Sequence, residues 1–169
     1  MNPRKKLRQL LAATRYVVVP GAYDTLTARL VQGAGFDAVY LTGGGYSRAS
    51  GYPDIGLVTM TEVTQWISRT VDAVEIPVIA DMDAGYGNAL NVIRAVREYE
   101  KTGVSAFHLE DQVSPKKCGH YEGKQVVSKT EMVGKIKAAV DTRRDVEHFR
   151  HGGLLHYVLR HRLSNERAA

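Results

Sequence analysis

Three acidic residues follow two short apolar stretches, in a pattern that could bind a metal. Asp81 and Asp83 end the stretch that begins at residue 77. Glu110 follows the stretch 106–109. A carboxylate at the end of a buried strand is costly unless it is paired or binds a cation. If the two stretches form neighbouring parallel strands, the acids meet at one edge of the sheet, and such hard oxygen ligands suit Mg²⁺, with Mn²⁺ as an alternative.

A fourth acid, Asp54, lies in the loop after the preceding strand. The alternative for all four acids is structural, because acids also cap helices and could pair here with Lys116 and Lys117. For any single acid the structural role is the better interpretation. For the first three acids together, the sequence favours a metal site.

A glycine-rich turn follows the second predicted strand. Glycine lets backbone N–H groups close on an anion, so Thr42, Gly43 and Gly44 are candidates for holding a carboxylate. The turn lacks the glycine spacing and the ribose-binding acid of a dinucleotide site.

The single cysteine lies in a basic loop. Cys118 is preceded by Lys116 and Lys117 and followed by Gly119 and His120, and positive neighbours favour a thiolate. Such a cysteine could transfer protons or act as a nucleophile. The alternative is an incidental loop cysteine.

The totals limit the class of protein. The chain has 169 residues, of which 44% are hydrophobic and 24% charged, which fits one globular domain. A lone cysteine excludes an internal disulfide and fits a reducing compartment, so we expect a cytoplasmic protein. No apolar run is long enough to cross a membrane. The net charge of +5 is concentrated near both ends without interleaved aromatic residues, which argues against nucleic-acid binding.

Apolar strands alternate with amphipathic helices along most of the chain. We expect strands at residues 16–19, 38–41, 78–81 and 106–109, and helix caps at Asp24, at Thr59 or Thr61, at Asn88, and at Ser128 or Thr130. This α/β alternation predicts a parallel sheet, either an open doubly wound sheet or part of a barrel. Acids at strand ends followed by long loops favour a partial (β/α)8 TIM barrel, comprising about four β/α units and an N-terminal helix.

The two ends of the chain differ from this pattern. Residues 1–15 predict a basic helix packed at the edge of the fold, in preference to a mitochondrial presequence. We assign residues 1–145 to the barrel. Residues 146–169 form a basic tail that contains four of the six histidines. We interpret this tail as non-homologous to the barrel, with a histidine-rich metal-binding tail as the alternative.

The motifs resemble those of the isocitrate lyase and phosphoenolpyruvate mutase superfamily over about residues 8–145. They are PGAYD at 20–24, TGG at 42–44, PDIG at 53–56, DMDAGYG at 81–87, LEDQ at 109–112 and KKCGH at 116–120. The last motif resembles the lyase branch, close to 2-methylisocitrate lyase. The resemblance implies a Mg²⁺-dependent carbon–carbon lyase that cleaves a small 2-hydroxy di- or tricarboxylate to pyruvate or glyoxylate and a succinate-like acid.

The resemblance also implies roles for individual residues. Asp81, Asp83 and Glu110 would hold the metal, with Asp54 nearby. Cys118 would protonate the succinate-like product, and a loop over residues 112–124 would close over the site. The other implied residues are Lys117 and His120, which tune the cysteine, and Thr42, Gly43, Gly44, Asp81 and Gly119, which contact the substrate.

Beyond Asp145 the sequence departs from the family. Family members continue into a fifth strand with a substrate-binding arginine, and they form homotetramers that exchange a C-terminal helix. The sequence after residue 145 contains neither feature. Two alternatives to the lyase therefore stay open. One is an inactive truncated paralogue or gene fragment, and the other is a phosphonomutase or oxaloacetate decarboxylase of the same superfamily.

Overall fold

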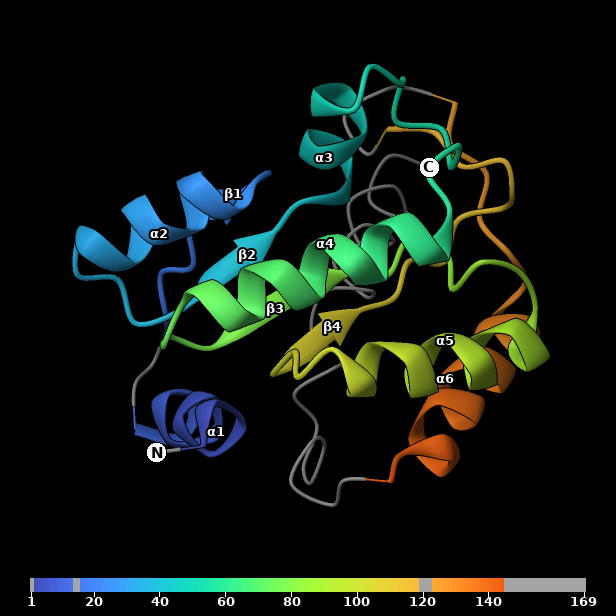
Figure 1. The fold of residues 1–169 in the computed structure, drawn as a ribbon. Coiled ribbons are helices and arrows are strands. Elements are labelled where there is room, and N and C mark those ends of the chain that lie inside the picture. Colours follow the sequence, from blue (N-terminus) through green and yellow to red (C-terminus); the bar gives the residue numbers. More distant parts are fainter. Residues whose placement is uncertain (1, 14–15, 119–122, 145–169) are drawn as a thin grey trace, which may run out of the picture.

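A computed structural model describes residues 2–13, 16–118 and 123–144. Its centre is a sheet of four parallel strands, β1 (Gly21–Ala22), β2 (Val39–Leu41), β3 (Val78–Asp81) and β4 (Ala106–His108). The strands lie in sequence order, β1-β2-β3-β4 (Figure 1). A doubly wound sheet reverses its strand order at a switch point, whereas a barrel adds each strand beside the last. The observed order confirms the predicted barrel arc.

Within the described residues, six helices accompany the strands. They are α1 (Pro3–Ala13), α2 (Thr25–Gly33), α3 (Gly43–Ala49), α4 (Met60–Ala73), α5 (Ala89–Lys101) and α6 (Lys129–Thr142). Asp24, Thr59, Asn88 and Ser128 cap α2, α4, α5 and α6, as the sequence predicts. Each cap side chain accepts a hydrogen bond from a backbone N–H of the first helical turn, which is otherwise without a partner. None of the helices in these described ranges is long and apolar enough to cross a membrane.

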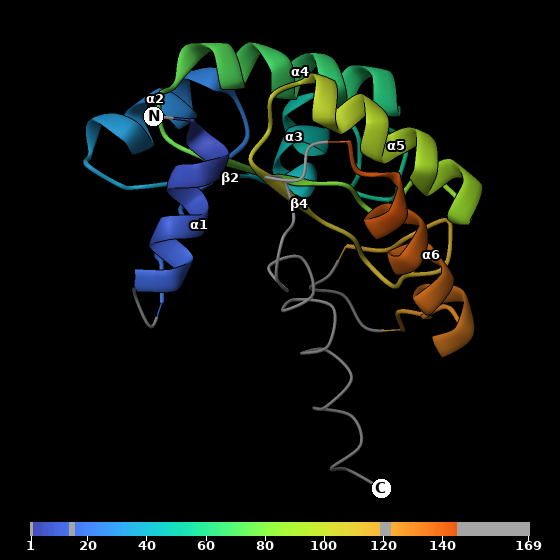
Figure 2. The ribbon, with the colours of Figure 1, turned by 90° about the horizontal axis from the view of Figure 1, so that it is seen from below.

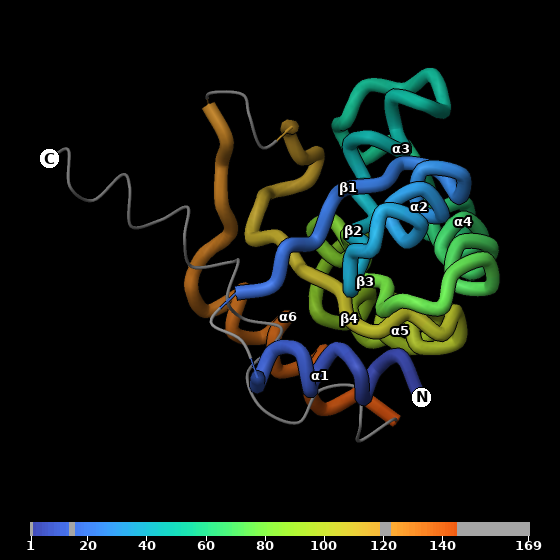
Figure 3. The backbone as a smooth tube through the Cα atoms, turned by 90° about the vertical axis from the view of Figure 1, so that its left-hand side faces the viewer, coloured from blue at the N-terminus to red at the C-terminus, as the bar shows by residue number. Residues whose placement is uncertain are grey.

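The helices α2, α4 and α5 lie on the same side of the sheet (Figures 2 and 3). The helix α3 lies beyond the carboxyl ends of the strands, and α1 lies at the opposite end (Figure 1). Arg4 of α1 donates hydrogen bonds to the backbone oxygens of Val104, at 3.1 Å, and Glu100, at 3.0 Å. These bonds attach α1 to the segment that leads into β4.

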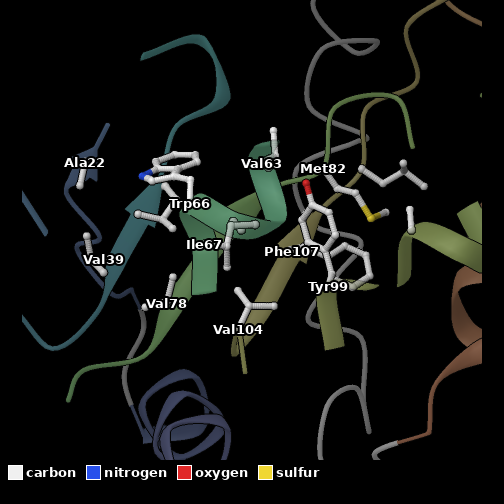
Figure 4. Packing of buried hydrophobic residues seen from close by; sticks show 14 of the residues in the cluster. Ala22, Val39, Val63, Trp66, Ile67, Val78, Met82, Tyr99, Val104 and Phe107 are labelled. Atoms are coloured by element: carbon white, nitrogen blue, oxygen red, sulfur yellow. The ribbon is translucent and has the colours of Figure 1, made fainter. Parts of the chain in front are cut away.

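The hydrophobic core fills the space between the sheet and these helices. Val39, Val78 and Phe107 point from the strands toward Ile67 of α4 and Tyr99 of α5 (Figure 4). The intervening strand residues are only partly buried, and they are Tyr40, Ile79, Ala106 and His108. The described residues bury one face completely and the other in part.

Two predicted elements differ from the structure. Residues 16–19 are not part of the sheet, and β1 comprises Gly21–Ala22 instead. The parallel register pairs Gly21 with Tyr40 near the start of β2, so the β-branched residues before Pro20 extend past the partner strand. The turn at Thr42 opens directly into α3, which Thr42 caps by accepting a hydrogen bond from Gly45. Three consecutive glycines predict a loop because glycine disfavours helix interiors, and tertiary contacts override that preference here.

Candidate active site

Three potential metal ligands meet at the carboxyl ends of β3 and β4. Asp81 is the last residue of β3, His108 is the last residue of β4, and Glu110 follows two residues later. One ligand atom from each side chain lies within 4.8 Å of the others. The register pairs Asp81 with His108, and residues 108 and 110 lie on the same face because side chains alternate along an extended chain. The sequence reasoning missed His108, although this alternation was available as a signal.

Asp81 is the most firmly held of these side chains. Its carboxylate is 9% exposed, and Oδ1 lies 3.2 Å from Nε2 of His108 and accepts a hydrogen bond from the backbone N–H of Asp83 at 2.8 Å. The hydroxyl of Tyr99 donates to its backbone oxygen at 2.8 Å. Burial acts to raise the pKa of Asp81, but His108 and the charge of Lys116 outweigh it and lower the pKa. Asp81 is therefore an anion held in one orientation.

His108 is a hydrogen-bonding partner of Asp81, and this contact affects its pKa. Burial acts to lower its pKa, but the hydrogen bond and charge of Asp81 raise it. The Nδ1 atom lies 2.8 Å from the hydroxyl of Tyr40, which can accept its proton. With Nε2 directed at a carboxylate and Nδ1 at a hydroxyl, the protonated ring has a partner for both N–H groups. His108 in this state orients Asp81 and leaves the oxygen atoms as metal ligands.

The other two carboxylates near Asp81, those of Glu110 and Asp83, have raised pKa values. Burial, together with the charge of Asp81, raises the pKa of Glu110 to about 7 and that of Asp83 to about 6. Gln112 donates a hydrogen bond to Oε2 of Glu110 at 2.9 Å. A divalent cation bound among these oxygens would relieve the repulsion that raises both pKa values. The donor set therefore fits Mg²⁺ or Mn²⁺.

Lys116 is buried and pairs with two of the acids. Its Nζ atom lies 3.0 Å from Oδ1 of Asp54, and it also forms an ion pair with Asp83. Burial acts to lower the pKa of Lys116, but the surrounding carboxylates raise it well above the ordinary value. Asp54 and Asp83 are thus paired with Lys116, which is the structural alternative to metal binding for these two acids. Asp83 lies next to Asp81, and the carboxylate of Asp83 faces the ammonium group of Lys116.

The glycine turn of α3 packs directly against the acids. An added Cβ at Gly43 would lie 2.8 Å from Oδ2 of Asp81, and one at Gly44 would lie 2.6 Å from Oδ2 of Asp54. Both distances are shorter than a Cβ contact allows, so alanine at either position would force the carboxylate or α3 to shift. The predicted carboxylate-binding turn and the acid cluster are therefore neighbours. The hydroxyl of Thr42 serves as the α3 cap, accepting from Gly45 at 3.3 Å.

Cys118 is buried next to this turn, with 5% of its surface exposed. Its sulfur accepts a hydrogen bond from Nη2 of Arg48 at 3.4 Å. Arg48 lies on α3, and the sequence reasoning missed it because no local pattern relates it to a cysteine 70 residues away. Lys117 points to its own loop and donates to the backbone oxygen of Gly123 at 3.2 Å. Gly119 and His120 lie outside the described residues.

Comparisons with known proteins agree with the motifs. A family profile described as phosphoenolpyruvate phosphomutase matches residues 7–149. The chain belongs to this family, and the resemblance inferred from the sequence is confirmed. It is 58% identical to 2,3-dimethylmalate lyase of Eubacterium barkeri over 85% of this chain and 50% of that protein.

Two further relatives define the range of chemistry in the family. The chain is 46% identical to 2-methylisocitrate lyase of Aeropyrum pernix, over 85% of this chain and 47% of that protein. It resembles the structure of phosphonopyruvate hydrolase in complex with oxalate and Mg²⁺ with a TM-score of 0.80 and 33% identity, over 88% of this chain and 50% of that chain. The chain thus spans about half the length of the relatives it matches, and those relatives are enzymes acting on small carboxylates.

Proposed function

We propose that this chain carries the metal-binding half of a carbon–carbon lyase that acts on a small 2-hydroxy di- or tricarboxylate such as 2-methylisocitrate or 2,3-dimethylmalate. The main support is the convergence of Asp81 and Glu110 beside a glycine turn at the carboxyl edge of a parallel sheet. These two carboxylates would hold Mg²⁺, with Asp83 as the third ligand and Asp54 nearby. The bound ion would act as a Lewis acid toward the 2-hydroxy or 2-oxo group.

Residues of the chain itself would bind the product and transfer the proton. Thr42, Gly43 and Gly44 would hold the carboxylate of the 2-oxo acid product. During cleavage the hydroxyl group would give its proton to water and become a carbonyl, the carbon–carbon bond would break, and the electron pair of that bond would leave with the second fragment as a carbanion. Cys118 would give its S–H proton to that carbanion.

The remaining predicted residues would assist this proton transfer. Lys117 and His120 would adjust the charge near Cys118, and Gly119 would contact the substrate. Closure of the loop 112–124 would exclude water from the carbanion.

The first test separates metal binding from turnover. Mn²⁺ binding would be measured by electron paramagnetic resonance in the unmodified chain, in Asp81→Asn, and in Asp72→Asn as a control. Asp72 is an exposed acid of α4, so its variant removes one charge away from the site. We expect Asp81→Asn to weaken binding at least about tenfold and Asp72→Asn to leave it unchanged. Equal binding by all three chains would refute the metal site.

The second test measures product. Release of pyruvate or glyoxylate from 2-methylisocitrate and 2,3-dimethylmalate would be followed with and without Mg²⁺. We expect Mg²⁺-dependent release that Cys118→Ser abolishes.

One observation favours a second candidate, a metal-binding chain without turnover. The sheet face that carries Tyr40, Ile79 and Ala106 is only partly buried. Mn²⁺ binding with no product release would support that second candidate.

A further inference from the structure

Arg48 connects the glycine turn to the basic loop of the candidate active site. Its Nη1 group donates a hydrogen bond to the backbone oxygen of Gly44 at 2.7 Å, and its Nη2 group donates to the sulfur of Cys118 at 3.4 Å. We propose that Arg48 is a positioning residue that holds the Cys118 sulfur against the glycine turn and stabilises its thiolate. The inference rests on the proposed role of Cys118 as the proton donor.

Guanidinium geometry suits this bridging role. Arginine presents several N–H groups in a rigid planar fork, so one side chain can bind a carbonyl oxygen and a sulfur at the same time. The contact to Gly44 fixes the fork relative to α3. The contact to Cys118 then places a permanent positive charge beside a sulfur that is almost completely buried. In such surroundings the charge acts on the sulfur with less screening than in water.

A carboxylate near Arg48 is already paired with a lysine. An added Cβ at Gly44 would meet Oδ2 of Asp54 at 2.6 Å and Nη1 of Arg48 at 3.3 Å, so both groups lie over the same glycine. Lys116 pairs with Asp54 at 3.0 Å. Asp54 thus has an ammonium partner of its own, and the guanidinium of Arg48 is hydrogen-bonded to the backbone oxygen of Gly44 and the sulfur of Cys118.

The lysines of the basic loop have other partners. Lys116 is committed to Asp54 and Asp83. Lys117 directs its ammonium group to the backbone oxygen of Gly123. Among the described residues, Arg48 is thus the cation with a hydrogen bond to the sulfur of Cys118.

The expected chemical consequence follows from charge balance. When Cys118 protonates a carbanion, its S–H bond breaks, a C–H bond forms, and the sulfur keeps the electron pair as a thiolate. The adjacent guanidinium stabilises that negative charge. The same thiolate is what attacks an alkylating reagent, so alkylation measures the effect of Arg48 without requiring any lyase activity.

The test is alkylation of the complete 169-residue chain by iodoacetamide over a range of pH. The thiolate displaces iodide and forms a carbon–sulfur bond, and mass spectrometry counts the product. Because the chain contains a single cysteine, every modified thiol is Cys118. The variants are Arg48→Gln, which removes the charge, and Arg48→Lys, which keeps it. Arg69→Gln removes an exposed arginine of α4 as the matched control.

We expect Arg48→Gln to slow alkylation near neutral pH about tenfold, with Arg48→Lys intermediate and Arg69→Gln unchanged. Partial unfolding cannot imitate this result, because exposure of a buried thiol accelerates alkylation. A rate for Arg48→Gln within about twofold of the unmodified chain, or faster, would overturn the inference. Failure to alkylate the folded unmodified chain at any pH, with full alkylation in urea, would overturn it as well.

The alkylation test can succeed or fail independently of the test for lyase activity. Alkylation that depends on Arg48 in a chain that releases no product would sustain the role of Arg48 and refute the lyase. Product release together with alkylation that does not depend on Arg48 would support the lyase and refute the role of Arg48.

Discussion

The contact between Gly43 and Asp81 makes a sharp prediction for the substitution Gly43→Ala. The added methyl group would lie 2.8 Å from Oδ2 and 3.1 Å from Cγ of the Asp81 carboxylate. That carboxylate cannot turn away freely, because His108 and the backbone N–H of Asp83 hold its other oxygen. Either α3 moves away from the sheet or Asp81 loses one of these partners.

Two opposing terms set the magnitude. Overpacking of this kind costs about 1–3 kcal/mol. Alanine is the better helix former, by up to about 1 kcal/mol, and Gly43 is the first residue of α3. The net expectation is destabilisation by about 1–2 kcal/mol, because the steric term exceeds the helix term. We also expect Mn²⁺ affinity to fall at least about tenfold, because an orienting contact of a proposed ligand is disturbed.

A matched control lies on α6. Nothing lies within 4 Å of an added Cβ at Gly134, which is also helical. Gly134→Ala should therefore stabilise the chain by about 0.5–1 kcal/mol through helix formation alone. Opposite signs for the two substitutions would show that the Asp81 contact, and not glycine replacement as such, causes the loss.

Urea unfolding followed by Trp66 fluorescence measures both effects. Trp66 is the single tryptophan, and it stacks on Tyr46 of α3 with ring centroids 4.2 Å apart. Its emission therefore reports whether α3 stays docked. If Gly43→Ala were as stable as Gly134→Ala and bound Mn²⁺ as well as the unmodified chain, the close packing of α3 on the acid cluster would be refuted.

The pH dependence of the metal-free chain follows from the raised pKa values of Glu110, about 7, and Asp83, about 6. The folded state holds these protons more tightly than the unfolded state, so the contribution of both groups to stability should fall as pH rises from about 5 to about 8, and saturating Mg²⁺ should reduce that fall. Thermal melts at several pH values test this, and a metal-free chain that becomes more stable over the same range would contradict it. A second prediction concerns Lys135 of α6, which is 3% exposed and donates to the backbone oxygen of Ala84 at 3.2 Å. Lys135→Met should cost about 1–3 kcal/mol by leaving that oxygen without its partner, whereas Lys137→Met, on the exposed face, should change stability by less than about 0.5 kcal/mol. Urea denaturation compares the two, and equal midpoints would refute a structural role for Lys135.

Local sequence signals were reliable where the structure depends on local geometry. Asp24, Asn88 and Ser128 cap their helices as predicted, because an N-cap interacts only with the next three residues. The failed prediction of a strand at residues 16–19 has a different cause. Those residues favour strand, but a strand also needs a partner in register, and β2 begins too late to supply one.

In the candidate site, too, some residues could be placed from the sequence and others only from the folded structure. Asp81 and Glu110 could be placed together from the sequence because the ends of neighbouring parallel strands must meet. Their partners could not be identified in this way. The pairing of Lys116 with Asp54 joins residues 62 positions apart in loops whose paths depend on packing. Lys116 pairs with Asp54 because the folded loops bring the two side chains together. No rule of sequence spacing specifies that pairing.

The amino-acid sequence alone determined the α/β alternation, the family and the strand-end acids, because hydrophobic periodicity and short motifs act over a few residues. The tertiary structure alone decided that His108 orients Asp81, that Gly43 packs closely against the Asp81 carboxylate, and that Arg48 reaches the sulfur of Cys118. Each of these features depends on two segments approaching within a few ångströms. That distance is set by how the whole core packs, and it leaves no periodic trace in the chain.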